Sequence, residues 1–312
     1  DNNARAGKAT CLTKAMAFLG HMFDVSSARA ASRSKRVQGA AFVQLAGGAT
    51  REGRSPFTVN QLRALQRGVV CLPAESDRII CGTVCALVAC RTRYQDLQRS
   101  AQEPVLDKAE DAPTYLEVKL GRTKTTNKAR SLLSKKVAAG HFDGLDGTEW
   151  ATAWLEARKR AGRGAKVDKC LLPAYSPSEG WLRRRMRNDE FNRNLKRLLT
   201  ILGAPPKEHQ LLGSHSSKVT LLSWCAKFGI GKGVIRSLGY HAKNKDQMPN
   251  LYSRDELAAP LRHLRAMEEA VAAGDFDPDA TRSGRFAKKR KRETPKGLSF
   301  LLSKDKKLHK LR

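Results

Sequence analysis

Most of the chain carries apolar residues at helical intervals, whereas one short segment alternates between apolar and charged residues. The alternating segment is Tyr115–Leu120, YLEVKL, and Gly121 follows it, which predicts a strand that enters a turn. The helical intervals predict amphipathic helices over residues 56–69, 76–99, 147–160 and 180–202. We therefore expect a mainly α fold with a small antiparallel β-sheet.

The ends and faces of these helices add detail. Ser55 is the expected N-cap of the first helix. The helix predicted over 180–202 has an apolar stripe, and its Arg and Lys residues fall largely on the other side. That basic side could follow a phosphate backbone and could equally be a solvated surface. All four tryptophans are expected in the core: Trp150, Trp154, Trp181 and Trp224.

Changes in composition predict three regions. Residues 1–55 are rich in Ala, Ser, Gly and Arg, and we interpret them as a loosely packed helical arm with one apolar patch, Ala15–Phe23. Residues 56–274 form the predicted main domain. Residues 275–312 are expected to be a basic, disordered tail, in which KKRKR, Lys288–Arg292, is typical of a nuclear-localisation or nucleic-acid-binding patch.

The charge points to a polyanionic partner. The 312 residues contain 59 Lys and Arg against 30 Asp and Glu, a net charge of +29, and such a balance is most often found in proteins that bind nucleic acid. About +11 of it lies from Arg282 onward. No apolar run approaches the roughly 20 residues that a membrane-spanning helix needs, so a membrane is not an expected partner.

The cysteines are interpreted as buried free thiols. Their number, seven, is odd, and no C-x-x-C pair is present. Cys81, Cys85 and Cys90 lie among small and apolar residues at spacings that suit the buried side of a helix. No His or second Cys pair accompanies them at the spacing of metal ligands, so a metal site is not predicted.

Reactive side chains gather in three segments of otherwise apolar, helical character. ACRTRYQDLQ places Arg93 three residues before Asp96, a spacing that puts both on one helix face. GSHSSKVTLLSW repeats that spacing with a His and a Lys, and LGYH is followed by LYSRDEL. The candidates in these last two segments are His215, Lys218, His241 and Tyr252.

Taken in order, these segments resemble the catalytic domain of the tyrosine recombinases, the phage-integrase family, over about Pro56 to Met267. The family pattern is an Arg with an acidic residue three later, a Lys on a β-hairpin, H-x-x-R, an L-G-H box and a Tyr shortly after it. Here Tyr240 is inserted before His241, and Lys218 stands where the family usually has Arg. The residues of the segments SHSSKVTLLSW and LYSRDELA are most similar to those of integrases of eukaryotic mobile elements.

The resemblance implies a reaction. Tyr252 would attack a DNA phosphodiester to give a 3′-phosphotyrosyl enzyme and a free 5′-hydroxyl. Arg93 would clamp two phosphate oxygens, with Asp96 orienting its neighbours, and His215 and His241 would contact the phosphate or assist proton transfer. No ATP, metal ion or small-molecule substrate is then needed, and the implied partners are double-stranded DNA and further copies in a tetramer on it.

The family's general acid is a hairpin Lys, and KLGRTKTTNK offers Lys119, Lys124 and Lys128. We select Lys124, because it follows the predicted strand and turn, and Lys119 is second. Lys218 keeps the positive charge of Arg but loses its bidentate fork.

Three functions remain open from the sequence. The first is strand cleavage and rejoining for a mobile element in the nucleus. The second is a DNA-binding protein derived from a recombinase that has lost catalysis, and the third is a type IB topoisomerase.

Overall fold

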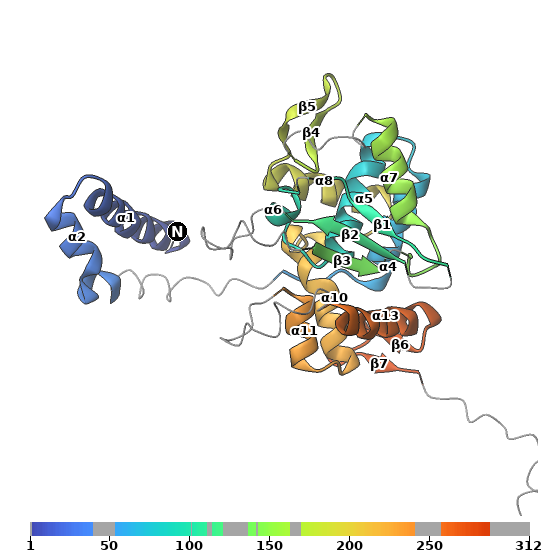
Figure 1. Ribbon diagram of the computed structural model, residues 1–312. Coiled ribbons are helices and arrows are strands. Elements are labelled where there is room, and N and C mark those ends of the chain that lie inside the picture. The colour runs from blue at the N-terminus through green and yellow to red at the C-terminus, as the bar shows by residue number, and fades with distance from the viewer. Residues whose placement is uncertain are drawn as a thin grey trace, which may run out of the picture. The chain divides into compact units, whose positions relative to one another are not determined.

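The computed structural model describes residues 2–39, 54–100, 102–110, 114–120, 137–141, 143–162, 170–240 and 257–287. The chain divides into two compact units, Asp1–Gly53 and Arg54–Arg312. The described residues are mainly helical with small antiparallel sheets, as predicted (Figure 1). Among the helices described, none has both the length and the apolar character needed to cross a membrane.

In the first unit, α1 (Asn2–Met22) and α2 (Ser26–Arg33) form a helical hairpin. They meet at Gly20, where an added Cβ would lie 2.9 Å from the Cα of Arg29. The guanidinium of Arg29 donates to the Gly20 carbonyl at 2.7 Å and contacts the Asp24 carboxylate at 2.5 Å. The pair is thus held by one arginine and one close backbone approach, which needs glycine.

The second unit is built around α5 (Glu75–Ala89), almost all of whose residues are buried. Four helices and strand β3 contact it. The closest approach is at Gly82, where an added Cβ would lie 2.1 Å from Cδ1 of Trp154. The Trp154 indole N–H also donates to the Ile79 carbonyl at 3.1 Å. The four helices are α4 (Val59–Cys71), α7 (Trp150–Arg160), α8 (Asn188–Ile201) and α10 (Ser214–Phe228).

A three-stranded antiparallel sheet in the order β1-β2-β3 packs at the end of α5. The strands are β1 (Val105–Asp107), β2 (Tyr115–Lys119) and β3 (Val137–His141). The strand predicted from YLEVKL is confirmed as β2, with Leu116 and Val118 fully buried as the alternation requires. Gly140 of β3 lies against α5, since an added Cβ would be 2.1 Å from the carbonyl oxygen of Ala89.

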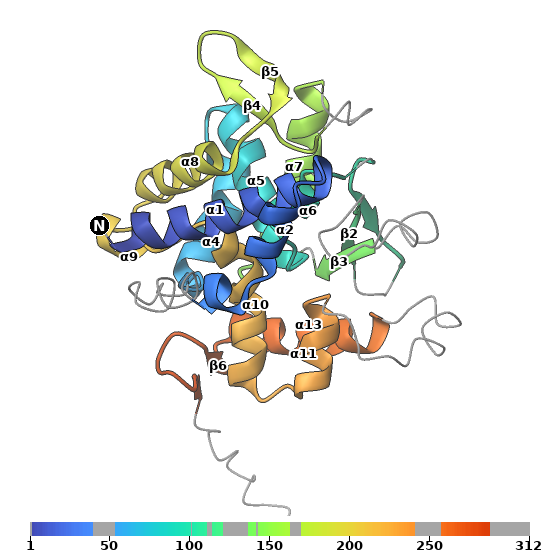
Figure 2. The same ribbon diagram turned by 90° about the vertical axis from the view of Figure 1, so that its left-hand side faces the viewer.

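The remaining elements complete the second unit. A two-stranded sheet, β4 (Pro173–Ser176) and β5 (Gly180–Arg185), precedes α8, and α9 (Pro206–His209) follows it. After α10 come α11 (Lys232–Leu238), α13 (Ala258–Ala273) and the short hairpin of β6 (Phe276–Asp277) and β7 (Arg285–Phe286). Figure 2 shows α10 running from the helices around α5 toward α11 and α13.

Helix α4 is confirmed, but the predicted N-cap was wrong. Thr58, not Ser55, caps it: the Thr58 hydroxyl accepts from the Gln61 backbone N–H at 3.2 Å, and the Gln61 side chain accepts from the Thr58 N–H at 3.1 Å. This reciprocal pair is a capping box. A second support comes from the far end of the chain, because the Asp279 carboxylate accepts from the Val59 N–H at 2.6 Å.

The helix predicted over 76–99 is interrupted. It ends at Ala89, where Arg91 adopts the left-handed conformation with φ 50°. The Arg91 N–H donates to the Val88 carbonyl at 3.0 Å and the Thr92 N–H to the Leu87 carbonyl at 3.2 Å. These two bonds form a Schellman motif, which usually has Gly at the left-handed position, as Gly229 does after α10.

The single helix predicted over 180–202 was also wrong. Its first part is strand β5, and only Asn188–Ile201 is helical. Gly180 adopts φ 72° in the β4–β5 turn, and helix α8 begins where Asp189 and Glu190 complement the positive end of the helix dipole. Trp181 lies on β5 and is half-buried beside Tyr175.

The other tryptophans and the three cysteines in and just after α5 were placed correctly, whereas Cys11 and Cys71 are exposed. Trp150, Trp154 and Trp224 are buried, and so are the thiols of Cys81, Cys85 and Cys90. The predicted start of a tail at residue 275 was early, because Phe276 is buried and packs edge-on against Phe228 at 5.2 Å between ring centroids. The β6–β7 hairpin therefore belongs to the folded unit, and residues 288–312 lie outside the described part.

Candidate functional site

The fully buried Arg91 guanidinium joins the segments that carry the candidate residues. It donates to the carbonyls of Leu238 at 3.1 Å and Ala139 at 2.8 Å, and also to that of Ala89. It contacts the Tyr240 hydroxyl at 3.3 Å. One side chain thus links the end of α5, strand β3 and the end of α11.

Arg93 and Asp96 lie directly after this junction. The prediction that Arg93 and Asp96 share one helix face was wrong. Arg93 is the N-cap of the short helix α6 (Tyr94–Leu97) and so precedes the helix that contains Asp96. Its guanidinium is 3.7 Å from the carboxylate of Asp96. The Arg93 side chain is 38% exposed and that of Asp96 only 8%. The Arg93 guanidinium can therefore contact a ligand, while the buried Asp96 carboxylate orients the guanidinium from the protein interior.

The first turns of α10 supply His215 and Lys218. His215 is exposed, and Lys218 is only 7% exposed. The Lys218 ammonium donates to the Gly239 carbonyl at 3.1 Å. Burial lowers the pKa of Lys218 to about 8, and the neighbouring Arg93 guanidinium adds to that shift, whereas Asp96 opposes it. The predicted residues Arg93, Asp96 and Lys218 are thus brought together.

The electrostatic balance of this group is positive. Arg91, Arg93 and Lys218 all contribute to it, and Asp96 is the buried carboxylate beside them. Glu268 of α13 adds little negative charge to this group. Burial raises the pKa of its carboxyl to about 8, so the neutral form is favoured near pH 7. A net positive charge beside a partly exposed guanidinium is what an anion-binding site requires.

Three predicted residues, Lys124, His241 and Tyr252, lie outside the described residues. Strands β2 and β3 pair antiparallel, and Lys124 falls in the sequence between them. Gly239, held by Lys218, lies two residues before His241.

Sequence reasoning missed Arg91 and Tyr240. Tyr240 has φ 56°, and burial raises the pKa of its hydroxyl to about 12, which makes it a poor nucleophile. Its ring lies 5.9 Å from the Arg91 guanidinium carbon. The signals were a second Arg in an apolar stretch, ACRTR, and the extra residue in LGYH, and neither indicates a partner by itself.

Comparison with protein-family models and with curated proteins gave no match to this chain.

The conformation and the side chain of Arg91 can be tested separately. Arg91→Gly keeps the left-handed backbone accessible but removes the guanidinium, and we expect the free energy of unfolding to fall by about 3 kcal/mol, because buried carbonyls lose charged donors. Arg91→Ala should lose about 1 kcal/mol more, because a Cβ is strained at positive φ. Urea unfolding measures both, and an alanine variant as stable as the glycine variant would contradict the argument.

The titration of Lys218 reports the positive potential. Its Cε and Nζ resonances, assigned through Lys218→Met, should titrate with a midpoint near pH 8. Arg93→Gln should raise the midpoint, because the repulsion that disfavours the ammonium is removed. The exposed Arg193 offers the control, since Arg193→Gln should leave the midpoint unchanged. An ordinary lysine midpoint in the native protein would disprove this description.

Proposed function

We propose that the chain cleaves and rejoins double-stranded DNA through a 3′-phosphotyrosine intermediate at Tyr252, as an integrase of a mobile element that acts in the nucleus. The observation that carries the proposal is the juxtaposition of Arg93, Asp96 and Lys218, two cations and one buried carboxylate from segments 122 to 125 residues apart in sequence. The basic segment Lys288–Arg292 and the net charge of +29 support a DNA partner and nuclear entry.

In this proposal each group has a chemical role. The Tyr252 oxygen bonds to phosphorus as the bond from phosphorus to the 5′-oxygen breaks. The tyrosine proton passes to His215 or His241, and Lys124 gives a proton to the departing 5′-oxygen. Arg93 donates to the non-bridging oxygens, where negative charge develops. A tetramer on DNA would bring the strands together for exchange.

The experiment uses a library of nicked duplexes with a randomised centre, because trapping selects the target site. The native chain should form a DNA adduct that survives detergent, and mass spectrometry after nuclease digestion should find the nucleotide on Tyr252. Tyr252→Phe should abolish the adduct. Tyr175→Phe, which removes an exposed hydroxyl on β4, should retain it. Equal adduct from Tyr252→Phe would refute the proposal.

One observation favours a second candidate, a DNA-binding protein that does not catalyse strand exchange. Lys218 is buried and its ammonium donates to a backbone carbonyl, so it serves the fold as well as any ligand. A lysine also lacks the planar fork that clamps two phosphate oxygens.

Lys218→Arg separates the two candidates. If the chain is an enzyme, the native protein forms the adduct, and the arginine variant forms it at least as fast because it has a second bidentate clamp. If the chain only binds DNA, neither protein forms the adduct although both retain affinity for duplex DNA. Trapping rates and binding isotherms, measured on the same duplexes, give the answer.

A further inference from the structure

The β4–β5 hairpin and the start of α8 hold a dense group of arginines. Residues 180–197 contain seven Lys and Arg and two acidic residues. In Figures 1 and 2 the hairpin projects from the helices of the second unit. Arg183, Arg184 and Arg185 are all exposed on β5.

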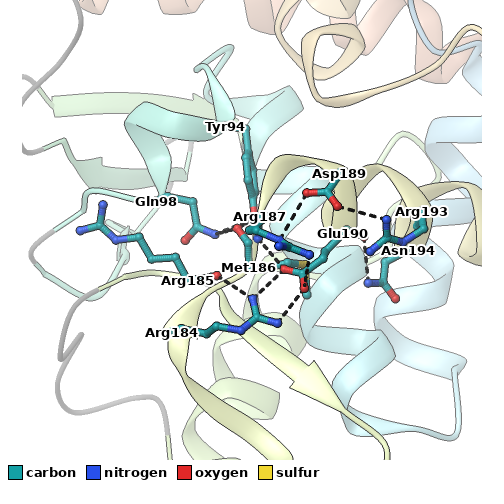
Figure 3. Close-up of polar contacts among 10 residues, drawn as sticks. All are labelled: Tyr94, Gln98, Arg184, Arg185, Met186, Arg187, Asp189, Glu190, Arg193 and Asn194. Atoms are coloured by element: carbon teal, nitrogen blue, oxygen red, sulfur yellow. Dashed lines mark hydrogen bonds and ion pairs between the residues drawn. The ribbon is translucent and has the colours of Figure 1, made fainter.

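The base of the hairpin is fixed to the helix that follows Arg93. The Tyr94 hydroxyl donates to the Met186 carbonyl at 2.8 Å. The Gln98 amide donates to the Leu172 carbonyl at 2.9 Å and accepts from the Leu172 N–H at 2.9 Å. Figure 3 shows Tyr94 of α6 and Gln98, the residue after α6, reaching Met186. The hairpin is therefore anchored at both ends by α6 and its C-cap residue, and Arg93 is the N-cap of the same helix.

The acidic residues of α8 engage one set of arginines. Arg184 makes two bonds to the Glu190 carboxylate, at 2.7 and 2.8 Å, and Arg193 bonds to Asp189 at 3.1 Å. Arg187 is 3.6 Å from both carboxylates. The Arg184 guanidinium is the main cause that lowers the pKa of Glu190 to about 2, so the carboxylate stays charged. Figure 3 shows these partners gathered at the start of α8.

The other two arginines of β5, Arg183 and Arg185, are also exposed. Trp181 and Arg185 pair with Tyr175 and Pro173 of β4, with an irregular register between the two pairs. The Trp181 ring packs edge-on against Tyr175 at 5.0 Å between centroids, which stiffens the strand pair. In Figure 3 the Arg185 side chain extends away from the contact between Arg184 and Glu190. Two exposed guanidinium groups separated by one residue can contact phosphates of one DNA strand.

We propose that the β4–β5 hairpin, through Arg183 and Arg185, is an arm that contacts the phosphate backbone of duplex DNA beside the Arg93 site. The inference rests on the proposed function for its DNA partner. An ordered pair of cations on a stiff support, anchored one residue from Arg93, favours a regular polyanion that also enters the site. The arm positions DNA and carries no sequence information of its own.

The test compares duplex-DNA affinity over a range of salt concentrations. The double variant R183Q/R185Q removes two phosphate contacts, so its logarithmic salt slope should be shallower by about 1.8, with affinity about tenfold weaker near physiological salt. R183K/R185K should keep most of the native slope, because lysine retains the charge. The control K159Q/R160Q loses the same charge from the exposed end of α7 and should keep the native slope.

The outcomes separate this inference from the proposed function. An unchanged slope in R183Q/R185Q, or a loss equal to that of the α7 control, overturns the arm even if the native protein forms the Tyr252 adduct. A shallower slope confined to R183Q/R185Q supports the arm, and it does so even if no adduct forms. Loss of affinity for single-stranded RNA with duplex affinity intact would overturn the arm as a DNA contact.

Discussion

The burial of the Arg91 guanidinium is the interaction on which the second unit depends. A charged group removed from water is tolerated only when its donors are satisfied, and here backbone carbonyls from α5, β3 and α11 satisfy them. The same residue accepts a left-handed backbone that costs a side chain about 1–2 kcal/mol. The hydrogen bonds offset that strain, and their geometry ends α5 where the chain must turn to present Arg93.

Positive charge is arranged differently at the two places where it accumulates. Around Lys218 the positive groups lie close together, since the ammonium is buried near Arg93 and its pKa is lowered. On the β4–β5 hairpin and α8 they are spread out, since Glu190 and Asp189 hold Arg184 and Arg193 whereas Arg183 is exposed on β5. Closely spaced charges favour a single anionic centre, whereas spread charges favour an extended anion.

Patterns with a local cause could be predicted from the sequence, and those with a distant cause could not. Alternation in YLEVKL gave β2, and helical periodicity gave α4 and the body of α5, because burial of one face determines each. The break at Arg91 depends on carbonyls far along the chain, and β5 depends on pairing with β4, so a helical pattern over 180–202 was misleading. At the site, the closeness of Arg93 and Asp96 followed from their spacing, whereas the proximity of Arg93 to Lys218 is tertiary. The sequence around Arg91 and Tyr240 is unusual but does not indicate which residues they contact.

The span of the Arg91 contacts determines when the site can exist. Its bond to Leu238 closes a loop of 147 residues, and the bond from Val59 to Asp279 closes one of 220. Loop closure at such separations comes late in folding, because its entropy must be met before the contact forms. During synthesis α5 emerges before its partners, because the Leu238 carbonyl that completes the Arg91 junction follows Arg91 by 147 residues. A chain that ends before Leu238 therefore has basic surface without an assembled site.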